Sequence, residues 1–161
     1  MLEYIKGMDV SSMDEIEQLG AVFYDEGKQG DLLEILKKYG SNYIRLRLWN
    51  DPRSEDGKPY GAGNTDYEVT LRMAKRVKAA GMKFLLDFHY SDFWADPGKQ
   101  RKPKAWVGYN AEQLEQAVYD FTKENMRKSL QRVYVLIWYR LVTNCLMVFS
   151  GRKDRCLIMI T

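Results

Sequence analysis

The first 126 residues alternate between short hydrophobic runs and longer amphipathic segments. The run YIRLRLW at 43–49 alternates strictly between aliphatic and other side chains, which predicts a β-strand. Other segments repeat apolar residues every three or four positions, which is typical of an amphipathic helix. We expect strands at 4–10, 43–49 and 82–90, and helices at 30–40, 69–80 and 111–126. The resulting order, β-α-β-α-β-α, favours a parallel sheet with right-handed crossovers.

The ends of these segments carry their own signals. Ser12, followed three residues later by Glu15, predicts a capping box at the start of a further short helix. Gly40 and Gly81 stand where helices are expected to stop. Loops after strands are long and polar, as in a (β/α) barrel or a doubly wound sheet, whose sites lie at the carboxyl ends of the strands. No Gly-x-Gly-x-x-Gly or Walker pattern follows a strand, so a nucleotide ligand is not indicated.

The strand at 43–49 has two chemically different faces. Its aliphatic face holds Ile44, Leu46 and Leu48, and its other face holds Tyr43, Arg45, Arg47 and Trp49. A buried guanidinium needs carboxylate partners, and Asp9 and Asp87 lie on the neighbouring predicted strands, with His89 on the face of Asp87. Solvent-facing arginines on an edge strand are the alternative. Because charges recur at the same level of three strands, we favour a functional pocket.

The segment LLDFHYSDFWADP at 85–97 concentrates polar and aromatic groups directly after a strand. His89 is the single histidine, either satisfied in the core or a hydrogen-bond donor to a ligand or catalytic carboxylate; we favour the donor. A zinc site is not indicated, because the chain has no second histidine to act as a ligand. No Ser or Cys nucleophile motif accompanies His89. Aromatic rings near strand ends suit the apolar faces of a sugar, with packing at the rim as the simpler explanation. These rings are Trp49, Tyr60, Tyr90, Trp94 and Trp106.

Composition supports a single globular domain. The chain has 161 residues, of which 45% are hydrophobic and 29% charged, with a net charge of +3. Its scattered basic residues argue against nucleic acid as a partner, and polar interruptions argue against a membrane span at 133–150. Cys145 and Cys156 form no metal-ligand pattern, and no cofactor is expected. No signal peptide is visible after Met1, which fits a cytoplasmic protein or a fragment of a secreted one.

Three stretches of the chain resemble one enzyme family. KGMDVSSM at 6–13, NYIRLRLWNDP at 42–52 and DFHYSDFWADP at 87–97 are similar to glycoside hydrolase family 53, the endo-β-1,4-galactanases, and the resemblance covers roughly residues 3–126. It implies an α/β fold, the (β/α)8 TIM barrel, of which about the first three to four βα units are expected here. It also implies endo-acting, retaining hydrolysis of the β-1,4-galactan of type I arabinogalactan by two glutamates.

The resemblance assigns roles to strand-end residues. Arg45 would hydrogen-bond the nucleophile, and His89 would line the catalytic subsite. The other expected substrate-binding or supporting residues are Asp9, Arg47, Trp49, Asp87, Asp92 and Trp94. A galactan chain is then the expected partner, and a family calcium site would lie outside this sequence.

The sequence departs from the family where the acid/base glutamate is expected. The Gly-Asn-Glu motif after a fourth strand is absent, and neither catalytic glutamate can be assigned. Glu112, Glu115 and Glu124 are expected to be solvated on a helix. We therefore expect residues 1–126 to form the N-terminal part of the barrel, in a chain that is inactive and self-associating when alone. The alternative is a non-catalytic, carbohydrate-binding half-barrel.

Residues 127–161 form a divergent tail, in which the family pattern disappears within a few residues of Val133. Read out of frame, the codon pairs across residues 141–144 permit glycine, asparagine and glutamate in succession. We hypothesise a frameshift between about Met126 and Val133, which the coding DNA tests.

Overall fold

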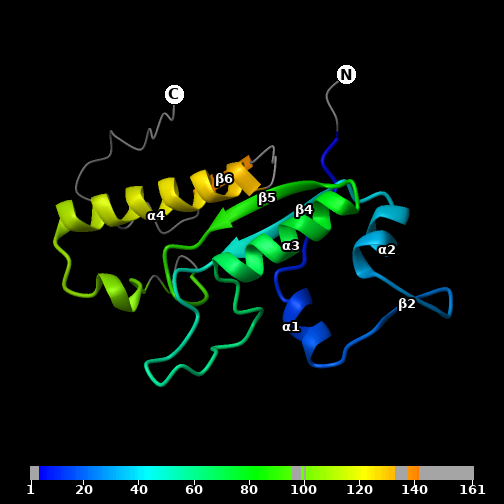
Figure 1. Ribbon diagram of the computed structural model, residues 1–161, viewed down its shortest axis with the longest axis horizontal. Coiled ribbons are helices and arrows are strands. Elements are labelled where there is room, and N and C mark those ends of the chain that lie inside the picture. Colours follow the sequence, from blue (N-terminus) through cyan, green and yellow to red (C-terminus); the bar gives the residue numbers. More distant parts are fainter. Residues whose placement is uncertain (1–3, 96–98, 100, 133–137, 142–161) are drawn as a thin grey trace.

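A parallel four-stranded sheet forms the centre of the molecule. The computed structural model describes residues 4–95, 99, 101–132 and 138–141, with side chains through Lys128. The sheet has the order β1-β4-β5-β6, and each neighbouring pair is parallel (Figure 1). Its strands are β1 (Gly7–Asp9), β4 (Tyr43–Leu48), β5 (Lys83–Phe88) and β6 (Trp138–Leu141). This arrangement confirms the predicted parallel order of the first three strands.

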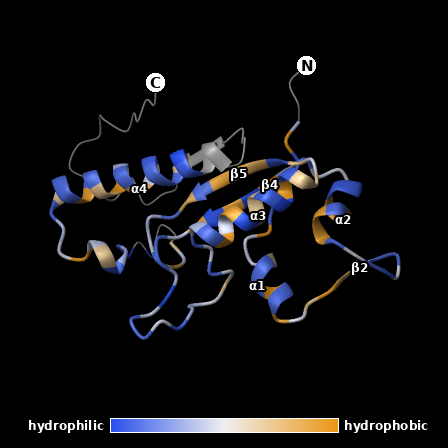
Figure 2. Ribbon diagram, in the orientation of Figure 1, coloured by the Kyte–Doolittle hydropathy of each residue, from blue (hydrophilic) through white to orange (hydrophobic). Residues whose placement is uncertain are grey.

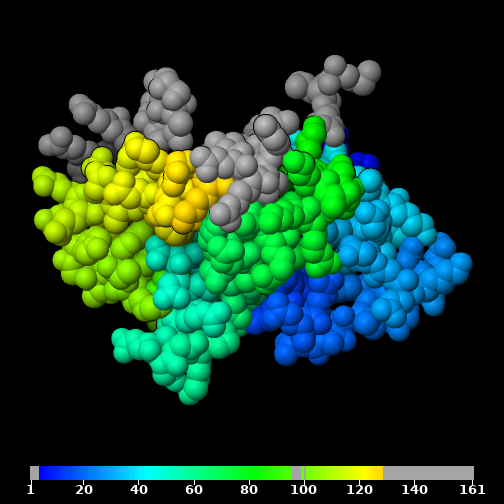
Figure 3. Space-filling model, viewed as in Figure 1, coloured from blue at the N-terminus to red at the C-terminus, as the bar shows by residue number. Residues whose placement is uncertain are grey.

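Helices supply the crossovers between these strands. The helices are α1 (Met13–Gln18), α2 (Leu32–Lys38), α3 (Tyr67–Ala79), α4 (Ala111–Arg132) and the 3-10 turn η1 (Lys104–Trp106). α3 lies along β4 and β5 (Figure 1). In the space-filling view, the loop from β4 to α3 protrudes at the lower edge, between the blue N-terminal part and yellow α4 (Figure 3). Every predicted helix is present, and α4 continues beyond its predicted end.

A small antiparallel hairpin between α1 and α2 was not predicted. It consists of β2 (Phe23–Asp25) and β3 (Lys28–Gly30). Its two loop residues, Glu26 and Gly27, have φ angles of 49° and 79°. Two positive φ values in a two-residue loop match the twist of the flanking strands, so Glu-Gly was the overlooked signal for this hairpin.

The core lies between the sheet and the helices that cover one of its faces. Ile44, Leu46 and Leu48 are at most 1% exposed and belong to one hydrophobic cluster with Val77 of α3 and Val118 of α4. In Figure 2 the hydrophobic colours concentrate on β5, α2 and α3, while the β4–α3 loop is mainly hydrophilic. The aliphatic face of 43–49 therefore packs under helices, as predicted.

Polar side chains at the starts of the helices show which backbone N–H groups are capped. Asp31 and Asp66 each accept a backbone N–H at the start of α2 and α3. The capping box predicted for Ser12 and Glu15 is wrong, because Ser12 makes no side-chain cap and the Glu15 carboxylate instead binds the β4–α3 loop. Gly81, with a φ of +72°, follows α3 at its predicted end.

The predicted tail at 127–161 is described only in part. Residues 127–132 complete α4, and β6 pairs with β5 from Leu85 opposite Trp138 to Phe88 opposite Leu141. The other tail residues, which include both cysteines and positions 142–144 of the frameshift hypothesis, lie outside the described residues. Within the described part, no helix combines the length and apolar character needed to cross a membrane.

Candidate functional site

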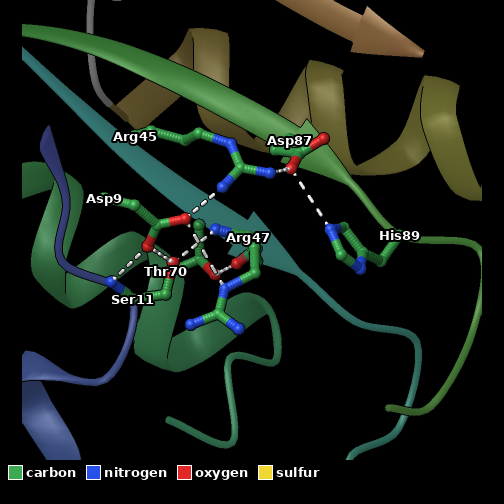
Figure 4. Close-up of polar contacts among 7 residues, drawn as sticks. All are labelled: Asp9, Ser11, Arg45, Arg47, Thr70, Asp87 and His89. Carbon is green, nitrogen blue, oxygen red and sulfur yellow. Dashed lines mark hydrogen bonds and ion pairs between the residues drawn. The ribbon is translucent and has the colours of Figure 1, made fainter. Parts of the chain in front are cut away.

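Arg45 lies at the centre of a charged cluster on the sheet face opposite the hydrophobic core. Its guanidinium binds Asp9 of β1 through Nη1 and Asp87 of β5 through Nη2 (Figure 4). The strand register explains the convergence, because Asp9 pairs directly with Arg45 and Asp87 pairs with Arg47. The Asp87 side chain is fully buried, so the guanidinium compensates a charge that water does not reach. One arginine thus links three strands.

His89 lies in this cluster rather than in the apolar core. Its Nε2 atom is 3.2 Å from Oδ2 of Asp87, and its ring centroid is 6.5 Å from that of Trp49 and 6.4 Å from that of Trp94. The residue is only 2% exposed, and Nδ1 has no hydrogen-bond partner among the described residues. Asp87 therefore orients one ring nitrogen of His89, and the other ring nitrogen is buried without a hydrogen-bond partner among the described residues.

Arg47 stands beside the same acids and beneath an indole ring. Its Nε atom is 3.7 Å from Oδ2 of Asp9, and its guanidinium carbon is 4.1 Å from the ring centroid of Trp94. Burial lowers the pKa of Arg47 from its ordinary value, and the nearby Asp9 carboxylate opposes that shift. Arginine stays charged regardless, so Arg47 presents a desolvated cation with donors to spare.

Aromatic side chains lie beside the charged cluster, and Phe93 and Trp94 form its aromatic wall. Trp49 is fully buried, with its ring centroid 6.4 Å from that of Trp94 and 5.4 Å from that of Phe93. Trp94 is 47% exposed, so one face of its indole is open to a ligand. Phe93, Trp94 and neighbouring residues line an open cavity of about 390 Å³. The aromatic wall has the character expected at a sugar-binding surface.

The assignment of two aromatic rings, those of Tyr90 and Trp106, to a sugar-binding surface is wrong. Tyr90 and Trp106 are buried in the hydrophobic core, where both pack against Phe121 of α4. The Tyr90 hydroxyl also lies 2.9 Å from Oγ1 of Thr122. Tyr60 stays near the pocket rim, with its ring 5.8 Å from that of Phe93. Alternation along β5 already places Tyr90 on the core face with Leu86 and Phe88, so that pattern was the available signal against a place at the rim.

Asp92 connects the outer loops to one another. Its two carboxylate oxygens accept the backbone N–H groups of Asp51, at 3.0 Å, and Lys104, at 2.7 Å. Lys104 also pairs with the Asp51 carboxylate at 2.6 Å. Desolvation acts to lower the pKa of Lys104, but the hydrogen bond to Asp51 and the negative charges of Asp92 and Asp51 together raise it. In the described contacts, Asp92 connects the loops that carry the aromatic wall. Its expected role in substrate binding stays a prediction.

Ser11 belongs to the site although its sequence gave no chemical signal. Its hydroxyl donates to Oδ1 of Asp9 at 2.6 Å and accepts the backbone N–H of Arg47 at 2.9 Å (Figure 4). The available hint was an Asp followed two residues later by Ser, a spacing at which the Asp side chain can accept the backbone N–H of the later residue in a turn.

The described glutamates lie elsewhere. Glu112, Glu115 and Glu124 are exposed on α4, as predicted. Among the described residues, no group of three or more His, Cys, Asp or Glu side chains could hold a metal ion. The cluster at the strand ends therefore offers ion pairs, hydrogen-bond donors and an aromatic face.

Parallel strands joined by helices, with charged and aromatic groups gathered at the strand ends, are the arrangement of a (β/α)-barrel protein. The chain belongs to glycosyl hydrolase family 53, whose sequence model matches residues 5–143.

Relatives of the chain support this membership. It is 45% identical over 130 residues to the endo-β-1,4-galactanase of Bacillus subtilis (strain 168), covering 80% of this chain and 30% of that protein. It is 38% identical over 121 residues to the arabinogalactan endo-β-1,4-galactanase of Cellvibrio japonicus (strain Ueda107), covering 74% and 30%. The chain thus spans about a third of the length of these curated relatives.

Solved structures agree with the fold. The GH53 catalytic domain of Ignisphaera aggregans superposes with a TM-score of 0.77 at 48% identity, over 80% of this chain and 36% of that one. A fungal β-1,4-galactanase structure gives a TM-score of 0.73 at 32% identity, over 83% and 38%. The predicted fold, an N-terminal part of a (β/α)8 barrel, is confirmed.

Proposed function

We propose that this chain carries the galactan-binding N-terminal part of an endo-β-1,4-galactanase. The observation that carries the proposal is the Asp9–Arg45–Asp87–His89 cluster beside the half-exposed Trp94. Relatives that share this part of the chain are named endo-β-1,4-galactanases. The substrate is then the β-1,4-galactan of type I arabinogalactan, cleaved within the chain by the complete family enzyme.

The pocket chemistry suits a galactose unit. A pyranose ring has an apolar face of C–H groups, which the exposed side of Trp94 can cover, and a hydroxylated edge. Buried polar atoms of the cluster and of Trp49 have no hydrogen-bond partner among the described residues: Nη1 of Arg47, Nδ1 of His89, Oδ1 of Asp87 and Nε1 of Trp49. A buried polar group without a partner costs about 1–3 kcal/mol. Sugar hydroxyls would relieve that cost, which favours a hydroxyl-rich ligand.

The charged cluster supports catalysis without performing it. Retaining glycosidases need two carboxyl groups about 5–5.5 Å apart, one as nucleophile and one as proton donor. Asp9 and Asp87 are both bound by Arg45, so neither is free to protonate a leaving oxygen. In the family mechanism, the roles of nucleophile and acid fall to two glutamates, and Arg45 would hydrogen-bond the nucleophile. We propose that this 161-residue chain alone binds galactan and does not hydrolyse it.

The second candidate is a non-catalytic, carbohydrate-binding half-barrel. The exposed positions of Glu112, Glu115 and Glu124, away from the pocket, favour it for this polypeptide. The two functions share one ligand and differ only in turnover, so a single assay separates them.

That assay measures reducing-end release from β-1,4-galactan by the 161-residue chain and by a version whose reading frame is restored after about Met126. The restored version is expected to cleave galactan, and the chain itself is not. Cleavage by neither version would favour the non-catalytic half-barrel. Cleavage by the 161-residue chain would contradict the proposed inactivity and place acid and nucleophile among residues dismissed above.

Binding is measured separately, by affinity electrophoresis in gels that contain β-1,4-galactan. Trp94→Ala should weaken binding about fivefold to tenfold, because a stacked aromatic contact contributes about 1 kcal/mol beyond its buried area. Tyr119→Ala removes a comparably exposed ring on α4 and should leave binding unchanged. Equal mobility of the wild-type chain with and without galactan would remove the ligand assignment.

We also propose that the chain self-associates. All three residues of β1 are exposed, and Tyr4, Ile5 and Met8 are exposed hydrophobic residues beside its free edge. Unpaired strand edges next to apolar side chains recruit other chains. Sedimentation velocity at low micromolar concentration checks this, and a monodisperse monomer would refute it.

A further inference from the structure

Ser11 fixes one oxygen of Asp9 from two directions. Its hydroxyl and its backbone N–H both donate to Oδ1 of Asp9, at 2.6 and 2.9 Å. The other oxygen, Oδ2, faces Arg45 and lies 3.7 Å from Nε of Arg47. The hydroxyl oxygen in turn accepts the backbone N–H of Arg47 at 2.9 Å. Ser11 is 1% exposed, whereas the Asp9 side chain is 30% exposed, so water reaches the carboxylate but not the serine.

The backbone of Ser11 is held by the β4–α3 loop. A Cβ atom at Gly63 would lie 2.3 Å from the Ser11 carbonyl oxygen, so the two backbones touch. The Glu15 carboxylate secures this approach, accepting from the Gly63 backbone N–H and from Nδ2 of Asn64, both at 2.6 Å. Ser11 is therefore constrained through its main chain as well as its side chain.

We propose that Ser11 is a positioning residue for the pocket. The hydroxyl orients Asp9, Asp9 shares Arg45 with Asp87, and Asp87 orients His89 (Figure 4). Loss of the hydroxyl leaves Oδ1 of Asp9 with one donor fewer and the Arg47 N–H without its acceptor. The Arg45 guanidinium can then shift toward Asp87, and this shift changes the electrostatic environment of the His89 imidazole. The binding consequence rests on the proposed function, whereas the effect on His89 does not.

The test uses the single histidine as a reporter in the full 161-residue chain. Histidine labelled with ¹⁵N gives two ring signals, which solid-state NMR records even if the chain self-associates. Ser11→Ala should move both signals in the direction seen for Asp9→Asn. Ser12→Ala is the matched control, because it removes a neighbouring hydroxyl that makes no side-chain cap, and its signals should match the wild type. Unmoved signals in Ser11→Ala would overturn the proposal.

The variant Thr70→Val distinguishes positioning of Asp9 from a general loss of rigidity around Arg47. The Thr70 hydroxyl donates to the Arg47 carbonyl at 3.3 Å, so this variant disturbs the same backbone without touching Asp9. Its His89 signals should stay in place, and a shift equal to that of Ser11→Ala would overturn the proposal. If Ser11→Ala does not fold, Ser11→Thr replaces it: the retained hydroxyl should preserve wild-type signals, and signals displaced as in Asp9→Asn would refute the inference.

Galactan binding gives the second measurement. Ser11→Ala should bind about tenfold more weakly than the wild type, and Ser12→Ala equally well. The double variant Ser11→Ala/Asp9→Asn should bind no more weakly than Asp9→Asn, because residues in one network are not additive. Fully additive losses would show that Ser11 does not act through Asp9. If the wild type binds no galactan, the proposed function fails, and the histidine signals still decide the role of Ser11.

Discussion

Gly63→Ala should be among the most damaging single changes in this chain, although it adds only a methyl group at a loop position. The new Cβ atom would lie 2.3 Å from the Ser11 carbonyl oxygen and 2.9 Å from its carbonyl carbon. Real Cβ atoms essentially never come closer than 3.0 Å to such neighbours, so two backbone segments must separate. The φ angle of +103° at Gly63 adds a second penalty, because side-chain-bearing residues rarely adopt it.

The expected magnitude combines these two effects. Holding a non-glycine residue in such a conformation costs about 1–3 kcal/mol. Separation of the backbones also weakens the hydrogen bonds that Gly63 and Asn64 donate to Glu15, and a hydrogen bond to a charged group contributes about 1.5–3 kcal/mol. A total near 4 kcal/mol is expected, which is a large share of the roughly 5–15 kcal/mol stability of a typical domain.

Gly57→Ala is the matched control, in the same loop. Its φ angle is +79°, but nothing lies within 4 Å of the position a Cβ atom would occupy, so only the conformational cost of about 1 kcal/mol applies. Urea unfolding is followed by the fluorescence of the buried indoles Trp49 and Trp106. With a slope of about 2 kcal/mol per molar urea, Gly63→Ala should lower the midpoint by about 2 M and Gly57→Ala by about 0.5 M. Equal shifts would refute the inferred backbone contact.

Three further changes test other parts of the fold by the same urea method. Hydrogen bonds from Arg72 chiefly lower the pKa of Asp14 below its ordinary value, so the pair stabilises the fold above about pH 4 and loses its effect as pH falls through the lowered pKa. Asp14→Asn should cost about 1 kcal/mol at pH 7 and progressively less as the pH falls below about 4; a difference that does not change with pH would contradict this. Leu86→Ala, at a 1% exposed position, should cost about 3 kcal/mol at any pH, and a loss under 1 kcal/mol would show that the site collapses or is not core. Asp92→Ala leaves two backbone donors, one of them on Lys104, without their acceptor and should cost about 2 kcal/mol; an unchanged midpoint would show that water replaces the carboxylate.

Much of the central sheet and its charged cluster could be predicted because strand geometry is local. Side chains alternate between faces with a period of two, so the pattern at 43–49 placed Arg45 opposite the aliphatic core without tertiary information. A parallel order then brought Asp9 and Asp87 to the same sheet face. The structure confirms this convergence through the ion pairs of Arg45.

Features that depend on distant partners were not predictable in this way. The Ser12 and Glu15 pattern satisfied a local rule, yet Glu15 binds Gly63 and Asn64, which lie almost fifty residues away in the sequence. The two hydrogen bonds that the Glu15 carboxylate accepts from the β4–α3 loop are favoured over the single hydrogen bond of a local helix cap. Tyr90 failed for a different reason: alternation along β5 places its ring on the core face with Phe88, and the sugar-binding interpretation did not apply that pattern.

The Arg45 bridge bears on how the sheet assembles as well as on what it binds. β1 has only three residues, so its backbone hydrogen bonds specify its alignment weakly. A slip of one residue against β4 would turn Asp9 toward the helices and remove it from Arg45. A slip of β5 would do the same to Asp87, leaving a buried carboxylate without its cation, at a cost of about 3–5 kcal/mol. The same guanidinium that shapes the pocket would therefore select the native alignment of both neighbouring strands during folding, and misaligned intermediates would be short-lived.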